Sequence, residues 1–141
     1  MIILDTNVVS EPLKPKPDLA VLKWLDAQDP QTLYITTINL AELLGGIELM
    51  PAGRKRTLLR SALDGQIMPL FEGRVLPFDA KAAVLFAQIN ASVQSQGETM
   101  SFADCAIAAI AQVNKFSIAT RNERDFKTTG VSLFNPWDFA D

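Results

Sequence analysis

Short apolar segments alternate with longer helical segments along the chain, and this alternation constrains the fold more than any other feature. The short segments are rich in β-branched residues and leucine, which is typical of buried strands. We expect strands at residues 1–4, 33–37, 75–78, 117–119 and 131–134. We expect helices at residues 18–29, 38–50, 54–67, 80–97 and 101–114. The alternation predicts an α/β fold with a mostly parallel central sheet, and the length of 141 residues predicts a single domain, residues 1–141.

The composition excludes several classes of active site. The chain has no His, which rules out Ser-His-Asp and Cys-His nucleophile systems and any imidazole general base. Cys105 is the only cysteine, so an intrachain disulfide and a zinc site of Cys and His are excluded too. The formal net charge of -3 does not indicate a protein that binds nucleic acids through charge alone. Any metal must therefore be held by oxygen atoms, which favours Mg²⁺ or Mn²⁺.

We expect no targeting signal at the start of the chain. Residues 1–4 contain no basic residue and lead directly to Asp5, unlike a secretory signal peptide. No apolar run approaches the ~18–20 residues needed to span a bilayer. We therefore expect a cytoplasmic protein without membrane association.

Asp5 comes directly after the first predicted strand. In open parallel sheets, ligands bind beyond the carboxyl ends of the strands, which makes Asp5 a candidate functional residue. The alternative is that Asp5 only ends the strand and caps the segment that follows.

Glu42 and Asp104 lie on two predicted helices, each without a basic residue one turn away. The helix around Glu42 is apolar on both sides, so we expect it to be buried, and a buried carboxylate needs a positive partner. Asp104 lies in the first turn of a helix that is apolar all round, where the helix dipole favours an anion. The alternatives are a solvated side chain for Glu42 and a helix cap, in the pattern Ser101-x-x-Asp104, for Asp104.

Asp125 lies in a polar segment after the fourth predicted strand. The alternative to a functional role is that Arg121 and Arg124 pair with it in an exposed loop. Three carboxylates, Asp5, Glu42 and Asp104, lack local counter-charges, and if they gather they repel one another and have raised pKa values. A divalent cation would remove that conflict and would polarise a phosphate and activate water for hydrolysis.

A basic segment is consistent with a nucleic-acid substrate. Arg54, Lys55, Arg56 and Arg60 crowd one predicted helix, with Arg74 further along the chain. The alternative is a solvated helix face, since charge runs are usually just that. The functional interpretation is a track for backbone phosphates, and we assign the same role to Arg121.

Five motifs, in this order and spacing, resemble the PIN-domain ribonuclease toxins of the VapC/FitB type, from bacterial type II toxin–antitoxin systems. They are Ile-Leu-Asp-Thr-Asn at 3–7, Ile-Asn-Leu-Ala-Glu-Leu at 38–43, Ser-Phe-Ala-Asp-Cys-Ala-Ile-Ala-Ala at 101–109, Ala-Thr-Arg-Asn-Glu-Arg-Asp-Phe at 119–126 and Asn-Pro-Trp at 135–137. The resemblance covers essentially the whole chain. It implies a three-layer α/β/α fold and a metal-dependent endoribonuclease.

The resemblance also assigns roles to individual residues. Asp5, Glu42 and Asp104 fall on the three acidic positions of the family, which bind Mg²⁺ or Mn²⁺. Asp125 serves as the fourth catalytic position, which varies in the family. Four polar residues are implied as supports: Thr6 and Asn7 to orient Asp5, and Thr120 and Asn122 to hold the metal or its waters.

The implied partners are RNA as substrate and a small DNA-binding antitoxin, which inserts a C-terminal segment into the acidic groove. A homodimer and a larger toxin–antitoxin assembly are implied as well. Two other functions stay open: a phosphohydrolase with Asp5 as nucleophile, and a module whose carboxylates only dock a basic peptide. The first often needs a second acid two residues on, where Asn7 stands. Cleavage of DNA is also left open.

Overall fold

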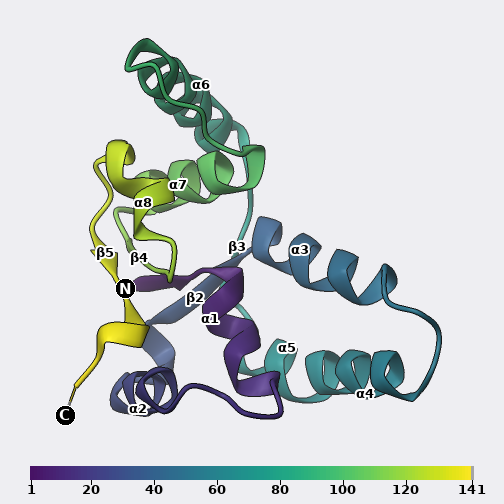
Figure 1. Ribbon diagram of the computed structural model, residues 1–141. Coiled ribbons are helices and arrows are strands. Elements are labelled where there is room, and N and C mark those ends of the chain that lie inside the picture. Colours follow the sequence, from purple (N-terminus) through teal and green to yellow (C-terminus); the bar gives the residue numbers. More distant parts are fainter. Residues whose placement is uncertain (141) are drawn as a thin grey trace.

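Five short parallel strands form the centre of the molecule in the order β3-β2-β1-β4-β5. The computed structural model describes residues 1–140 (Figure 1). The strands are β1 (Ile2–Leu4), β2 (Leu33–Thr36), β3 (Val75–Leu76), β4 (Ser117–Ala119) and β5 (Leu133–Phe134). All pairings are parallel, and Leu4 of β1 lies beside Ala119 of β4. The carboxyl ends of β1, β2 and β4 therefore meet at one edge of the sheet.

Helices cover both faces of this sheet. The helices are α1 (Thr6–Ser10), α2 (Leu19–Ala27), α3 (Thr37–Glu48), α4 (Arg54–Ala62), α5 (Met68–Leu70), α6 (Ala80–Ser95), α7 (Phe102–Asn114) and α8 (Glu123–Phe126). A π-helical turn, Leu63–Ile67, joins α4 to α5. In Figure 1, α6 and α7 lie above the sheet, and α1, α2 and α5 lie below it. No helix within residues 1–140 is both long and apolar enough to cross a membrane.

Successive side chains of each strand point to opposite faces of the sheet, and this divides the core into two clusters. Ile3 and Ile118 pack with α6 and α7 on one face of the sheet. Their neighbours Leu4 and Ala119 pack with α1, α2 and α5 on the other. This is the period-two alternation of a strand buried on both faces. The expected three-layer α/β/α arrangement with a parallel sheet is confirmed.

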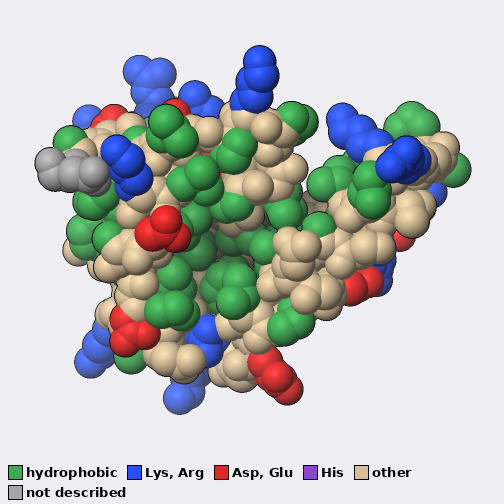
Figure 2. Space-filling view, turned by 90° about the horizontal axis from the view of Figure 1, so that it is seen from below, with side chains coloured by type: hydrophobic (Ala, Val, Ile, Leu, Met, Phe, Trp, Pro, Cys, Tyr) green, Lys and Arg blue, Asp and Glu red, His purple; other side chains and the backbone are tan. Residues whose placement is uncertain are grey.

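The underside of the molecule is hollowed. A cavity of about 340 Å³ lies among α1, α2 and α5 and is lined mainly by apolar side chains. Figure 2 shows this side, with hydrophobic side chains around the hollow. Asp26 and Arg74 are the charged residues of the lining.

The expected burial of the helix around Glu42 is wrong. Helices α3 and α4 extend away from the sheet as an arm (Figure 1), so much of α3 has no layer above it. Glu42 is exposed, and Leu49 at the end of α3 is 88% exposed. Apolar residues on both sides of a helix predicted burial, but here one apolar side faces solvent. Glu42 therefore does not need a positive partner to offset burial.

Candidate active site

Asp5 stands at the carboxyl end of β1 and caps α1. Its backbone N–H donates to Ala119 O over 2.9 Å, which continues the pairing of β1 with β4. Its carboxylate accepts from Thr6 N at Oδ1 and from the Thr120 hydroxyl at Oδ2, each over 2.8 Å. The side chain is nearly enclosed, with the residue 5% exposed. Asp5 is thus both a cap and a fixed, buried acidic group.

Glu42 is connected to the same region through Thr6. The Thr6 hydroxyl donates to Glu42 Oε1 over 2.7 Å and accepts from Asn39 Nδ2 over 3.1 Å. Asn39 is itself fixed, because its Oδ1 accepts from both the backbone N–H and the hydroxyl of Thr36. Sequence reasoning did not identify Asn39. The Thr36-x-x-Asn39 capping box at the start of α3 was the available signal, although it does not predict the contact with Thr6.

Asp104 lies in the first turn of α7. The Ser101 hydroxyl accepts from its backbone N–H over 3.1 Å, so the capping pattern read from the sequence is present. The carboxylate is half-buried, and its pKa is raised from 3.8 to about 6. Burial is the main cause, a hydrogen bond from Ser101 opposes it, and the charges of Asp5, Asp125 and Glu42 add to it. Asp104 can therefore both take part in the helix cap and belong to the acidic cluster.

The charges of these acidic side chains act on one another. Burial raises the pKa of Asp5, the hydrogen bonds from Thr120 and Thr6 oppose it, and the charges of Glu42 and Asp125 raise it further. Within residues 1–140, none of the carboxylates of Asp5, Glu42, Asp104 and Asp125 forms an ion pair. The edge of the sheet thus carries a cluster of negative charge that no side chain in this part of the chain neutralises.

Asp125 lies on α8, directly after the turn that follows β4. The suggested pairing of Asp125 with Arg121 and Arg124 is absent from the described residues. Instead, the Arg121 guanidinium lies over the Trp137 ring, 5.1 Å from its centroid. The turn is tied back to the site, because Asn122 N donates to the Thr120 hydroxyl over 3.0 Å.

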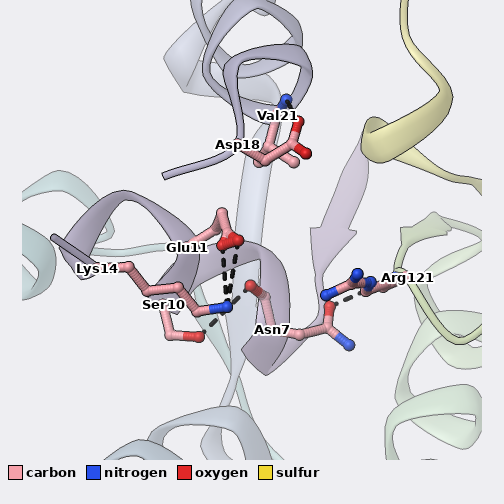
Figure 3. A network of polar contacts seen from close by, with 7 residues as sticks. All are labelled: Asn7, Ser10, Glu11, Lys14, Asp18, Val21 and Arg121. Carbon is pink, nitrogen blue, oxygen red and sulfur yellow. Dashed lines mark hydrogen bonds and ion pairs between the residues drawn. The ribbon is translucent and has the colours of Figure 1, made fainter. Parts of the chain in front are cut away.

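Asn7 has its side-chain contact with Arg121 and not with Asp5's own partners. Its Oδ1 accepts from the backbone N–H of Arg121 over 3.4 Å (Figure 3), and no direct hydrogen bond joins it to Asp5 in the described part of the chain. Asn7 therefore links α1 to the turn after β4. The residue that contacts the acidic groups directly is Thr6, which binds Asp5 through its N–H and Glu42 through its hydroxyl.

The donor set fits a hard divalent cation in its chemistry. Every candidate ligand is a carboxylate, which Mg²⁺ and Mn²⁺ prefer, and mutual repulsion favours a bound cation. In the side-chain positions of residues 1–140, however, no three acidic groups converge closely enough to ligate one ion. Glu42 and Asp125 are exposed, so they can reorient without disturbing the core.

Some of the basic side chains on α4 are already engaged in ion pairs. Arg56 pairs with Glu48 over 2.8 Å, and Arg60 pairs with Asp64 over 3.0 Å and lies 3.8 Å from Glu48. Arg54 and Lys55 are exposed and form no ion pair within residues 1–140. Lysine and arginine side chains gather on the projecting arm in Figure 2.

One basic residue of α4 approaches the acidic cluster. Lys55 lines a groove of about 350 Å³ together with Thr6 and Glu42. Arg74 does not belong to this surface. It donates to Leu33 O over 2.9 Å and to Leu70 O, so it ties β2 to α5.

Comparison with known proteins agrees with this architecture. The family described as PIN domain matches residues 2–131. A VapC ribonuclease, Y4jK, from Sinorhizobium fredii is 45% identical, over 99% of this chain and 100% of that protein. The toxin FitB from Neisseria gonorrhoeae is 42% identical, over 97% of this chain and 99% of its own length. The solved structure of FitAcB from Neisseria gonorrhoeae has a TM-score of 0.94 at 42% identity, and the match covers 99% of this chain and 100% of that one.

The chain belongs to the PIN-domain family. Within this family it falls in the group of the VapC and FitB proteins, which confirms the resemblance seen in its motifs.

Proposed function

We propose that this protein is the nuclease toxin of a toxin–antitoxin pair and hydrolyses RNA phosphodiester bonds at a bound Mg²⁺ or Mn²⁺. Asp5, Asp104 and Glu42 would hold the metal, and Asp125 would take the fourth position. The observation that carries the proposal is the cluster of acidic groups without ion-pair partners within residues 1–140, in which burial and mutual repulsion raise the pKa of Asp5 and Asp104. The name ribonuclease given to several relatives supports RNA as the substrate.

Under this proposal, some of these side chains bind the metal and others accept a proton. When bound, a divalent ion polarises the phosphate and lowers the pKa of water. Hydrogen bonds to both oxygens fix the carboxylate of Asp5, so it is suited to binding and not to proton transfer. Glu42 and Asp125 are exposed and can accept a proton from the attacking water. Thr6 couples the two roles, because it contacts both Asp5 and Glu42.

The residues around Asp5 do not favour its use as the nucleophile of a phosphohydrolase. That chemistry often needs a second acid two residues on, where Asn7 stands, and the Oδ1 of Asn7 accepts from the backbone N–H of Arg121.

The partners of the structural neighbours support an antitoxin for this chain. One neighbour is a structure of FitAB bound to an IR36 DNA fragment, with a TM-score of 0.94 and 40% identity over 100% of this chain and 99% of that one. We propose that a small DNA-binding antitoxin neutralises the carboxylate cluster with a basic side chain, since a guanidinium pairs well with carboxylates. We also propose a homodimer, a larger toxin–antitoxin assembly and a cytoplasmic location, where RNA and antitoxin are both available.

The test is 5′-end mapping of cellular RNA after brief expression, with the wild type compared with Asp5→Asn. Glu72→Gln serves as a control, because it removes one charge from an exposed turn away from the site. New ends are expected with the wild type and Glu72→Gln and not with Asp5→Asn. Purified wild type should cleave the mapped RNA with Mg²⁺ or Mn²⁺ and not with EDTA, and a DNA strand of the same sequence tests whether DNA is also cut.

Cleavage by Asp5→Asn at the wild-type rate would refute the assigned site. Identical end profiles from wild type and Asp5→Asn, with soluble protein free of antitoxin, would instead support the module that only docks a basic peptide.

A further inference from the structure

Arg121, for which the sequence predicts contacts to backbone phosphates, is paired with Trp137, a residue that has no role so far. The guanidinium carbon of Arg121 is 5.1 Å from the ring centroid of Trp137. Within residues 1–140 this guanidinium forms no ion pair and donates no hydrogen bond, although Glu123 and Asp125 follow it in the same segment. Because the guanidinium makes no other polar contact among these residues, its N–H donors are available to a ligand.

Trp137 is a fixed support for this cation. It lies in the 3₁₀ turn Pro136–Asp138, where the Asn135 side chain accepts from its backbone N–H over 3.0 Å. The turn packs against α2, and the indole packs against the core cluster that contains Val21 and Trp24. The position of the ring is thus set by the core and not by Arg121.

The backbone also places Arg121 at the rim of the site. Arg121 follows Thr120, whose hydroxyl donates to Asp5. Its own N–H donates to Asn7 at the start of the chain, as Figure 3 shows. Arg121 is therefore anchored to the site through its backbone, while its guanidinium lies over Trp137 and forms no ion pair with the acidic groups within residues 1–140. Such a group is suited to an anion that lies partly in the acidic site and extends beyond it.

We propose that Trp137 is a positioning residue that holds Arg121 to bind a phosphate of the RNA strand next to the one being cleaved. This inference rests on the proposed function, since it takes the substrate to be a polynucleotide. A guanidinium matches the geometry of a phosphate with two parallel hydrogen bonds. Stacking on an anchored ring orders the long arginine side chain before the substrate arrives, which lowers the entropic cost of binding.

Binding is measured first, without cleavage. In an Asp5→Asn background with constant Mg²⁺, the affinity for a short fluorescein-labelled single-stranded RNA of mixed sequence is followed by anisotropy as KCl is raised. Arg121→Ala should weaken binding about tenfold and reduce the salt slope by about 0.7, as for one phosphate contact on a single strand. Arg124→Ala is the matched control, since Arg124 lies three residues further along, on α8, with the same charge and no ring contact within residues 1–140. It should change the slope less than Arg121→Ala does.

The role of the ring is tested with conservative variants. Trp137→Phe keeps an aromatic face, whereas Trp137→Leu keeps an apolar side chain without one. We expect Trp137→Leu to weaken binding several-fold and Trp137→Phe to retain most of the affinity. Arg121→Lys, which leaves Trp137 untouched, should keep the salt slope and still lose affinity several-fold, because an ammonium lacks the planar fork. In cleavage assays with Asp5 intact, these losses should appear in KM and not in kcat.

Three results would overturn the inference: equal effects of Arg121→Ala and Arg124→Ala, equal effects of Trp137→Leu and Trp137→Phe in folded proteins, or a loss confined to kcat. Thermal unfolding of each variant identifies any that fails to fold, and Arg121→Lys then provides the test. The two proposals fail separately. If the wild type cleaves RNA and substitutions of Arg121 and Trp137 have no effect, only this inference is refuted. If the wild type binds RNA through these residues and never cleaves it, the proposed function is refuted.

Discussion

Replacing Asp104 with Asn should stabilise the metal-free protein at neutral and alkaline pH while abolishing its activity. The folded protein holds the pKa of Asp104 at about 6, above its ordinary value of 3.8. The folded state therefore binds a proton more tightly than the unfolded chain does. The contribution of Asp104 to the free energy of unfolding falls as pH rises from about 4 to about 6, and above that range the charged carboxylate destabilises the fold.

The size of this effect follows from the same pKa values. A change from 3.8 to about 6 corresponds to about 3 kcal/mol, at about 1.4 kcal/mol per pH unit. Because the side chain is only half-buried, solvent screens the charge, and we reduce the expected effect to about 1–1.5 kcal/mol. For a chain of this length, Asp104→Asn should raise the thermal midpoint by about 3–5 °C at pH 8.

The assay is thermal unfolding by circular dichroism in EDTA, at pH 4 and at pH 8. The gain should be present at pH 8 and small at pH 4, where Asp104 of the wild type is itself protonated. Glu72→Gln, which removes an exposed charge, should show neither the gain nor its pH dependence. A variant that is less stable than wild type at pH 8, or equally stabilised at both pH values, would refute the reasoning.

Three further predictions concern Asp5, Thr6 and Asn39. Mn²⁺ should raise the thermal midpoint of the wild type and not that of Asp5→Asn, as differential scanning calorimetry would show; equal shifts would exclude Asp5 as a ligand. Thr6→Val should lower cleavage about 10–100-fold, because Glu42 loses its hydrogen bond, whereas Thr6→Ser should stay near wild type in a steady-state assay. Asn39→Leu should cost about 2–3 kcal/mol in urea unfolding, because it leaves the buried N–H and hydroxyl of Thr36 without an acceptor; a cost below about 0.5 kcal/mol would contradict this.

The sequence predicted the elements better than their arrangement. Strand 117–119 was placed correctly, because a short apolar run between polar residues permits little else. The last expected strand, 131–134, is shortened to Leu133–Phe134, because a strand at the edge of a sheet is defined by pairing on one side alone. The order of the strands has no local pattern. It brings Thr120 to Asp5 across a separation of 115 residues.

In the candidate site too, local features could be predicted from the sequence and long-range contacts could not. The end of a strand and the first turn of a helix have local patterns, and these indicated Asp5 and Asp104. The contact of Asn39 with Thr6 and the contact of Arg121 with the Trp137 ring have no such pattern, since they join distant parts of the chain. The burial expected for Glu42 was wrong for a related reason. An apolar helix face shows that a partner can be buried there, but not that this chain provides one.

The acidic site and the stability of the fold make opposite demands, and under the proposed function this would allow two different cations to bind at one site. Charged Asp5 and Asp104 lower the stability of the metal-free protein, because their raised pKa values oppose ionisation in the folded state. Any cation that neutralises them, whether a divalent metal or a guanidinium from a partner, recovers this free energy and stabilises the fold by linkage. Under the proposed function, the metal and the antitoxin would therefore compete for the same carboxylates, and each would stabilise the fold when bound. Inhibition by the antitoxin then requires that its basic side chain outcompete the metal for the carboxylates. By linkage, saturating metal should weaken antitoxin binding to the same degree that antitoxin weakens metal binding.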